Sequence, residues 1–193
     1  GVLSLAGCAR YQQVSLYQLD SGTVSVPMAE QGVAVLLGPV AIADYLQREA
    51  LLQRQADGSL TSAEDARWAG SLAADIDQQL LRQLASRLDS QRLVLAPAAP
   101  GFIPQVRLAL SITRLDSGPQ RPAVLEAQWR LAGADGKLLD GRLVRLEEAH
   151  GGSIVDQVRA QSLLLQQLVE QLAVAVEEHG APAPAVAPPV RKP

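Results

Sequence analysis

The sequence predicts an α+β fold in which a mixed, largely antiparallel sheet of about five or six strands packs against two long amphipathic helices on one face. Three observations predict it. Apolar residues recur at helical spacing in two long segments. Segments between these two alternate apolar and polar residues, as half-buried strands do. Asp-Gly and Gly-Pro pairs, which favour turns, separate the segments.

The composition limits the classes of function. Hydrophobic residues make up 48% of the chain and aromatic residues only 3%, so Leu, Val, Ile and Ala must build most of the core. The net charge is -3, and no stripe of Lys and Arg interleaves with aromatics, so we expect no nucleic acid partner. Cys8 is the single cysteine, which excludes an intramolecular disulfide and a thiolate metal cluster. With only two histidines besides, no metal or cofactor is expected.

The first third of the chain carries three short strand patterns. Residues Val14–Leu19 alternate in part and predict one strand after a tether. The apolar run Val33–Leu37 predicts a buried central strand that ends at Gly38-Pro39. A further short strand is expected at Leu51–Gln55, before the Asp57-Gly58 turn.

The first helix is expected to begin after Leu60. Thr61 and Glu64 have the spacing of a capping box, in which each side chain accepts a hydrogen bond from a free backbone N–H. The apolar stripe of this helix recurs every four residues, and Trp68 at its start is interpreted as a core residue rather than a contact residue. The stripe comprises Trp68, Leu72, Ile76, Leu80, Leu84 and Leu88.

A β-meander is expected between the two helices. Arg92–Leu95 predicts a short strand before the loop at residues 97–101. Three longer strands then follow, separated by a turn over Asp116–Pro122 and by the hairpin signal Asp135-Gly136. They are predicted at Val106–Ile112, Leu125–Leu131 and Leu138–Glu147.

The second helix is expected to begin at Ser153 and to stop at Gly180. Ser153 is a good N-cap, and Asp156 in the first turn favours the helix dipole. The apolar face comprises Val158, Leu165, Leu168, Leu172 and Val176. Beyond it, residues 180–193 are rich in Ala and Pro, which predicts a disordered tail that serves as a spacer; a groove-binding segment is the alternative.

The N-terminus suggests lipidation. Residues 1–7 resemble the end of a signal peptide, and Leu5-Ala6-Gly7-Cys8 is similar to the lipobox of bacterial lipoproteins. Cys8 is therefore predicted to carry fatty acyl chains such as palmitate, although a small buried cysteine is the alternative. Ala9 follows the cysteine. In bacterial lipoproteins Asp at this position resembles an inner-membrane retention signal, so Ala favours the outer membrane. The predicted organisation is a residual signal peptide (1–7), a lipid-anchored tether with the first strand (8–31), a periplasmic α+β domain (32–179) and the tail (180–193).

The patterns that catalysis requires are weak. Neither His150 nor His179 accompanies a nucleophile elbow or a phosphate-binding glycine loop, and we interpret His150 as an exposed loop residue. Carboxylate pairs could hydrolyse peptidoglycan, but Asp75 and Asp77 are expected on different faces of the first helix. The pair Glu147-Glu148 is expected at a strand end, as solvated surface charge. We therefore predict a protein that is not an enzyme.

Six landmarks occur in order along the chain: Leu5-Ala6-Gly7-Cys8, Tyr17-x-Leu19, Val35-x-x-Gly38-Pro39-Val40-x-Ile42, Asp44-Tyr45-Leu46-x-Arg48, Arg67-Trp68-Ala69-x-x-Leu72 and Ala127-Gln128-Trp129-x-Leu131. Together they resemble the ABC-type transport auxiliary lipoproteins of the paraquat-inducible protein C (PqiC) family. The resemblance implies an outer-membrane lipoprotein that works with MCE-domain proteins, which move lipids between the two membranes. The chain departs at Ala43, where the family often has Pro, and in its longer tail.

The resemblance also suggests where a partner binds. Tyr45, Leu46 and Arg48 are a candidate contact surface, with core packing of the Tyr-Leu pair as an equal alternative. The expected partner is an MCE-domain protein of a transport complex, docked by several copies of the chain in a ring. Two other functions remain open: a lipid- or lipoprotein-binding periplasmic carrier, which requires a deep apolar cavity, and a periplasmic hydrolase.

Overall fold

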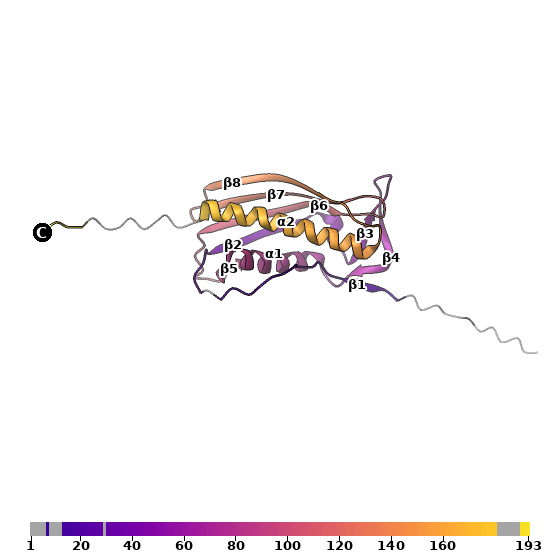
Figure 1. The fold of residues 1–193 in the computed structure, drawn as a ribbon, viewed down its shortest axis with the longest axis horizontal. Helices are drawn as coiled ribbons and strands as arrows, with labels where there is room; N and C mark the ends of the chain where they lie inside the picture. Colours follow the sequence, from indigo (N-terminus) through magenta and orange to yellow (C-terminus); the bar gives the residue numbers. More distant parts are fainter. Residues whose placement is uncertain (1–6, 8–12, 29, 181–189) are drawn as a thin grey trace, which may run out of the picture.

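A computed structural model describes residues 7, 13–28, 30–180 and 190–193, and its fold consists of two sheets and two helices (Figure 1). The larger sheet has five strands in the order β5-β2-β6-β7-β8. Strand β2 is parallel to both β5 and β6, whereas β6, β7 and β8 form an antiparallel meander. The predicted mixed, largely antiparallel sheet is thus confirmed. The strands are β2 (Val35–Ile42), β5 (Leu93–Leu95), β6 (Val106–Asp116), β7 (Ala123–Gly133) and β8 (Leu138–Glu148).

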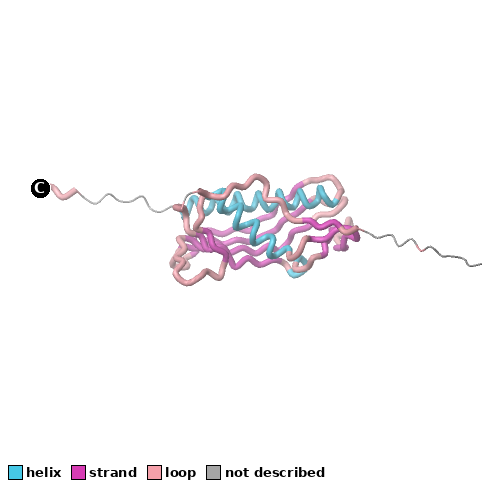
Figure 2. The backbone as a smooth tube through the Cα atoms, turned by 90° about the horizontal axis from the view of Figure 1, so that it is seen from below, coloured by secondary structure: helices cyan, strands magenta, loops and turns pink. Residues whose placement is uncertain are grey.

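Two helices cover one face of this sheet, as predicted (Figure 2). Helix α1 (Leu72–Leu88) packs on β2, β5 and the second helix, α2 (Ile154–Gly180), which packs on β6, β7 and β8. All five apolar residues predicted for the face of α2 are buried. None of the helices among the described residues is long and apolar enough to cross a membrane.

The other three strands form a separate small sheet, which the sequence patterns do not predict. Its order is β1-β4-β3, with β1 (Ser15–Tyr17) parallel to β4 (Leu60–Trp68) and β3 (Ala50–Arg54) antiparallel to it. The short strand expected before Asp57-Gly58 is therefore present as β3, and the Asp57-Gly58 turn leads from β3 into β4.

Strand β4 shows that the predicted start of the first helix was wrong. Residues 60–68 are strand, so Thr61 and Glu64 are not a capping box. Because β4 pairs with β1 on one side and β3 on the other, sheet hydrogen bonds satisfy its backbone more fully than a lone first helical turn would. Gly70 has a φ of +93°, and Ser71 then caps α1 by accepting a hydrogen bond from Ala74.

Strand β2 extends further than the sequence predicts. The expected stop at Gly38-Pro39 is wrong, because pairing with β6 resumes at Val40 and continues to Ile42. The register shifts between Leu37 and Val40, so the Gly-Pro pair lies in an irregularity of the ladder. Proline has no N–H to donate, so it is tolerated at an irregularity, where the ladder does not need that hydrogen bond.

Residues Gln18 to Met28, which we call the strap, connect the small sheet to the loop before β2 and run along α1 (Figure 1). Its backbone N–H groups donate to helix side chains: Leu19 to Asp75 (3.1 Å), Asp20 to Ser162 (2.9 Å) and Ser25 to Ser86 (3.0 Å). Strand β1 and the C-terminal end of α2 lie at opposite ends of the long axis of the molecule (Figure 1).

Candidate functional site

The predicted contact residues lie in and just after a short 3₁₀ helix, η1 (Asp44–Leu46), between the two sheets. Leu46 is buried in the hydrophobic core, and Tyr45 is half-buried. Arg48 is exposed. Of the three side chains, only Arg48 is largely free to contact another protein, whereas Tyr45 and Leu46 hold the element in place. The contact surface itself stays a prediction.

The Tyr45 hydroxyl belongs to a polar group that we call the Asp116 cluster: Asp116, Arg54, Arg114 and Tyr45. The hydroxyl donates to Asp116 Oδ2 (3.0 Å) and accepts from the backbone N–H of Leu115 (2.9 Å). Arg54 approaches the carboxylate with Nη2 at 2.6 Å and Nε at 3.3 Å, and Arg114 Nε lies 3.3 Å away. The Asp116 side chain is only 1% exposed, so two cations and a hydroxyl surround a buried anion.

Burial and charge act in opposite directions on the Asp116 carboxyl. Burial raises its pKa, but the hydrogen bonds and charges of Arg54 and Arg114 outweigh this effect and hold the pKa below its ordinary value. Burial raises the pKa of Tyr45 to about 12, although the hydrogen bond from Leu115 lowers it. At neutral pH the cluster therefore contains an ionised carboxylate and a protonated phenol.

A buried polar network continues this junction from β3 to α2. Gln157 Nε2 on α2 donates to Gln53 on β3 (3.0 Å), and Gln157 Oε1 accepts from Ser117 (3.1 Å). Gln161 Nε2 also donates to the Ser117 hydroxyl (2.9 Å). Strand β3, the end of β6 and helix α2 are thereby joined by hydrogen bonds, so the small sheet and η1 have a fixed position on the large sheet.

We predict that Tyr45→Phe lowers the free energy of unfolding by about 1–2 kcal/mol, because it leaves the buried Leu115 N–H without its acceptor and removes one donor from Asp116. Urea unfolding followed by far-UV circular dichroism measures this loss. Tyr17→Phe on β1 is the control and is expected to change stability by less than about 0.5 kcal/mol. Equal stability of the wild type and Tyr45→Phe would contradict a structural role for the hydroxyl.

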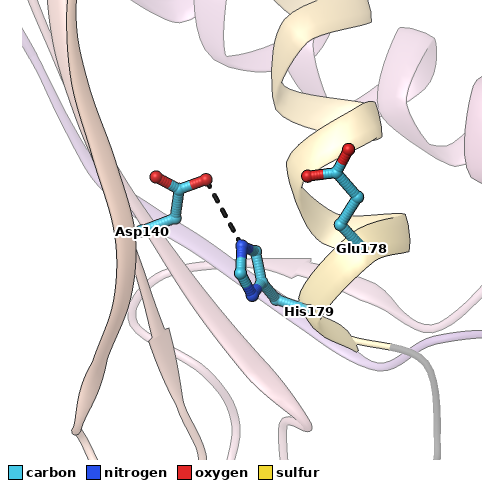
Figure 3. A group of neighbouring side chains, drawn as sticks. All are labelled: Asp140, Glu178 and His179. Carbon is cyan, nitrogen blue, oxygen red and sulfur yellow. Dashed lines mark ion pairs between the residues drawn. The ribbon is translucent and has the colours of Figure 1, made fainter.

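A second group of titratable side chains lies where the end of α2 faces β8 (Figure 3). His179 Nε2 is 3.4 Å from Asp140 Oδ2, and Glu178 brings a third ligand atom within 4.8 Å of the other two. These are donors that a divalent cation accepts. The group is partly exposed, and the contact between the Asp140 carboxylate and the His179 ring accounts for its geometry. Sequence reasoning missed it because Asp140 is distant in the chain from the two helix residues.

The other residues weighed for chemistry take part in separate local contacts. Asp75 binds the strap through the Leu19 N–H, and Glu147 pairs with Arg145 at 2.9 Å. His150 is half-buried rather than exposed, with Nδ1 against the Gly151 carbonyl. Cys8 lies outside the described residues, so its lipidation stays a prediction. Most of the Pro-rich tail, residues 181–189, lies outside them as well.

The model of the ABC-type transport auxiliary lipoprotein component family matches residues 17–173, which extend from β1 into α2. The chain belongs to this family. It is accordingly an auxiliary lipoprotein component of ABC-type transport, and lipoproteins of this kind are associated with a membrane. The match includes η1 and the whole Asp116 cluster, whereas Cys8 precedes it.

Solved structures share the fold of this auxiliary lipoprotein at low sequence identity. A crystal structure of an uncharacterized protein aligns with a TM-score of 0.68 and 21% identity, covering 85% of this chain and 99% of the other. A Xanthomonas campestris protein of the family DUF330 aligns with a TM-score of 0.65 and 14% identity, covering 86% and 98%. A PelC dodecamer from Paraburkholderia phytofirmans covers 88% and 97% at 14% identity, but its TM-score of 0.44 indicates only a weak likeness. Among curated proteins, none matches the chain significantly.

Proposed function

We propose that this protein is an outer-membrane lipoprotein that docks an MCE-domain protein of an ABC-type transport system on the periplasmic side. The family match over residues 17–173 carries the proposal. The lipobox-like Leu5-Ala6-Gly7-Cys8 stands shortly before that match and supports an anchor at Cys8. In this arrangement residues 8–31 are the tether with the first strand, residues 32–179 are the periplasmic body, and residues 180–193 are a spacer.

The proposed contact surface is η1 with the residue that follows it. Arg48 is exposed, and an arginine combines contact area with several directed donors, which makes it a frequent determinant of binding. Tyr45 is anchored to Asp116 and Leu46 to the core, so the element is preorganised and loses little conformational entropy when a partner binds.

The role proposed is structural rather than catalytic. A protein that only holds its partner in place catalyses no reaction and therefore needs no cofactor. We further propose that several copies form a ring around the partner, since a symmetric partner favours a closed, symmetric assembly. The molar mass of the purified complex, measured by light scattering, tests this ring.

The anchor is tested with a precursor that carries a complete signal peptide. We expect Cys8→Ser to lose palmitate labelling and to move from the membrane fraction to the soluble fraction. The physical reason is that two or more acyl chains hold a protein on a membrane stably, whereas a body without them has no such attachment. Ser4→Ala, which leaves the cysteine in place, is the control. A Cys8→Ser protein that remains in the outer-membrane fraction would refute the anchor.

The docking partner is tested by purifying the tagged protein from detergent extracts and identifying bound proteins by mass spectrometry. An MCE-domain protein is expected with the wild type, and about tenfold less of it with Arg48→Glu, because the reversed charge removes a hot-spot cation. Arg67 is an exposed arginine on β4, so Arg67→Glu is the matched control and should retain the partner. Recovery of no MCE-domain protein with the wild type would refute the proposed docking role.

A further inference from the structure

The strap and α1 enclose a groove whose walls are mostly hydrocarbon. Its volume is about 420 Å³, within the range of sites that hold small molecules. The strap supplies one wall, and α1 with β5 supplies the other. The apolar residues that line it are Val24, Val26, Pro27, Leu81, Ala85 and Leu93.

Part of this apolar surface faces water. Val26 is 82% exposed and Val24 is 38% exposed, although both lie on a segment that hydrogen bonds hold against α1. Covering exposed hydrocarbon releases its hydration water and is favourable. A ligand with an apolar body would therefore gain free energy at this position.

Several polar groups that line the groove are engaged within the protein. The Ser25 N–H donates to Ser86, the Ser90 hydroxyl to the Val33 carbonyl, and the Gln91 amide to the Pro27 carbonyl. Arg82 lines the same groove and is exposed, and its guanidinium has no ion pair or hydrogen bond with any described residue. The groove thus combines apolar walls with one available cation.

We propose that this groove binds one acyl chain of an anionic phospholipid, with the phosphate at Arg82. A guanidinium matches the geometry of a phosphate and can bind it through two N–H groups. A hydrocarbon chain can cover the apolar walls without needing any hydrogen bond from them.

The proposal is independent of the docking partner and goes beyond it, because it assigns a ligand to the chain itself. The full chain, purified without acylation so that no attached fatty acid competes, is titrated by calorimetry with dioctanoyl phosphatidylglycerol below its critical micelle concentration. Saturable binding is expected, and dioctanoyl phosphatidylcholine, which has no net charge, is expected to bind about tenfold more weakly. Inorganic phosphate alone should not displace the lipid, since it fills none of the apolar groove.

Two variants with matched controls locate the site. Val26→Asp places a charge on the exposed wall and should weaken lipid binding by about tenfold or more, whereas Val155→Asp, on the exposed face of α2, should not. Arg82→Gln should remove the preference for the anionic lipid, and Arg67→Gln should retain it. These substitutions are on exposed residues, so the fold tolerates them. Absence of saturable binding to the wild type, or equal binding by wild type and Val26→Asp, overturns the proposal.

Discussion

Replacing Asp116 by Asn is expected to lower the free energy of unfolding by about 3 kcal/mol. Removing one partner of a buried charge pair costs about 3–5 kcal/mol, because the remaining charge has lost both water and its counterion. Arg54 and Arg114 are 21% and 26% exposed, so water reaches them in part and the lower end of this range applies. The amide nitrogen of Asn also faces donors instead of accepting from them. Urea unfolding at pH 7 measures the loss.

Acid should remove most of this difference between wild type and Asp116→Asn. The carboxyl titrates near pH 4 in the unfolded chain, and its pKa in the folded protein is lower. The stabilisation is therefore fully present above about pH 4 and is lost as the pH falls through the folded-state value. Asp65→Asn on the exposed face of β4 is the control, with an expected change below about 0.5 kcal/mol. A wild-type advantage that is constant from pH 7 to pH 2 would contradict the ionic role of Asp116.

Gly118→Ala is expected to destabilise the protein by about 3 kcal/mol or more, since overpacking a rigid backbone contact costs at least as much as overpacking side chains. A Cβ at this buried position would lie 1.8 Å from the backbone oxygen of Arg54, closer than any real contact. The loop after β6 would have to move away from β3, and the hydrogen bond from Arg54 N–H to the Ser117 carbonyl (2.8 Å) would lengthen. The melting temperature, measured by differential scanning calorimetry, reports the loss.

Gly133→Ala provides the comparison for this substitution. Its Cβ would meet the Asp135 carboxylate at 3.1 Å, and that side chain can rotate away. We expect a change below about 1 kcal/mol. If both alanine variants melted at the same temperature as the wild type, the close approach of the loop to β3 would not be a feature of the protein in solution.

The parts of the fold that the sequence predicts are those with an unambiguous period. Alternation in β7 places Leu125, Ala127, Trp129 and Leu131 on the helix-covered face, and all four are buried. The four-residue spacing from Leu72 to Leu84 likewise identifies α1. In both segments local preference and tertiary packing favour the same structure, so a pattern in one sequence is sufficient.

The prediction fails where two patterns overlap. Trp68 lies four residues before Leu72 and seemed to extend the helical stripe, yet it is the last residue of β4. Within β4, buried Ala66 and Trp68 alternate with exposed Asp65 and Arg67, which is the strand period. The glycine at position 70 marks the boundary, and pairing with β1 and β3, distant in the sequence, decides between the two structures.

The Asp116 cluster lies beyond prediction from a single sequence, because its members come from η1, β3 and β6, whose contacts depend on the tertiary fold. Asp116 itself was interpreted as the first residue of a turn. One signal was present for the adjoining polar network: Gln157 and Gln161 lie four residues apart on the same stripe as Leu164 and Leu168, where a polar residue requires a buried partner. Tyr45 was chosen as a candidate contact residue from the family resemblance. Its hydrogen bonds to Asp116 and Leu115 show that it also has a structural role.

Strand β1 lies at one end of the long axis and the C-terminal end of α2 at the other, so an anchor near β1 would limit how far each end can lie from the membrane. If Cys8 carries the anchor, the backbone between it and Ser15 spans at most about 25 Å when fully extended. The β1 end of the body then stays within that distance of the bilayer surface, and the opposite end can lie further from it by at most the length of the body. The dimensions of the body would therefore set the greatest distance from the bilayer at which its far end can meet a partner.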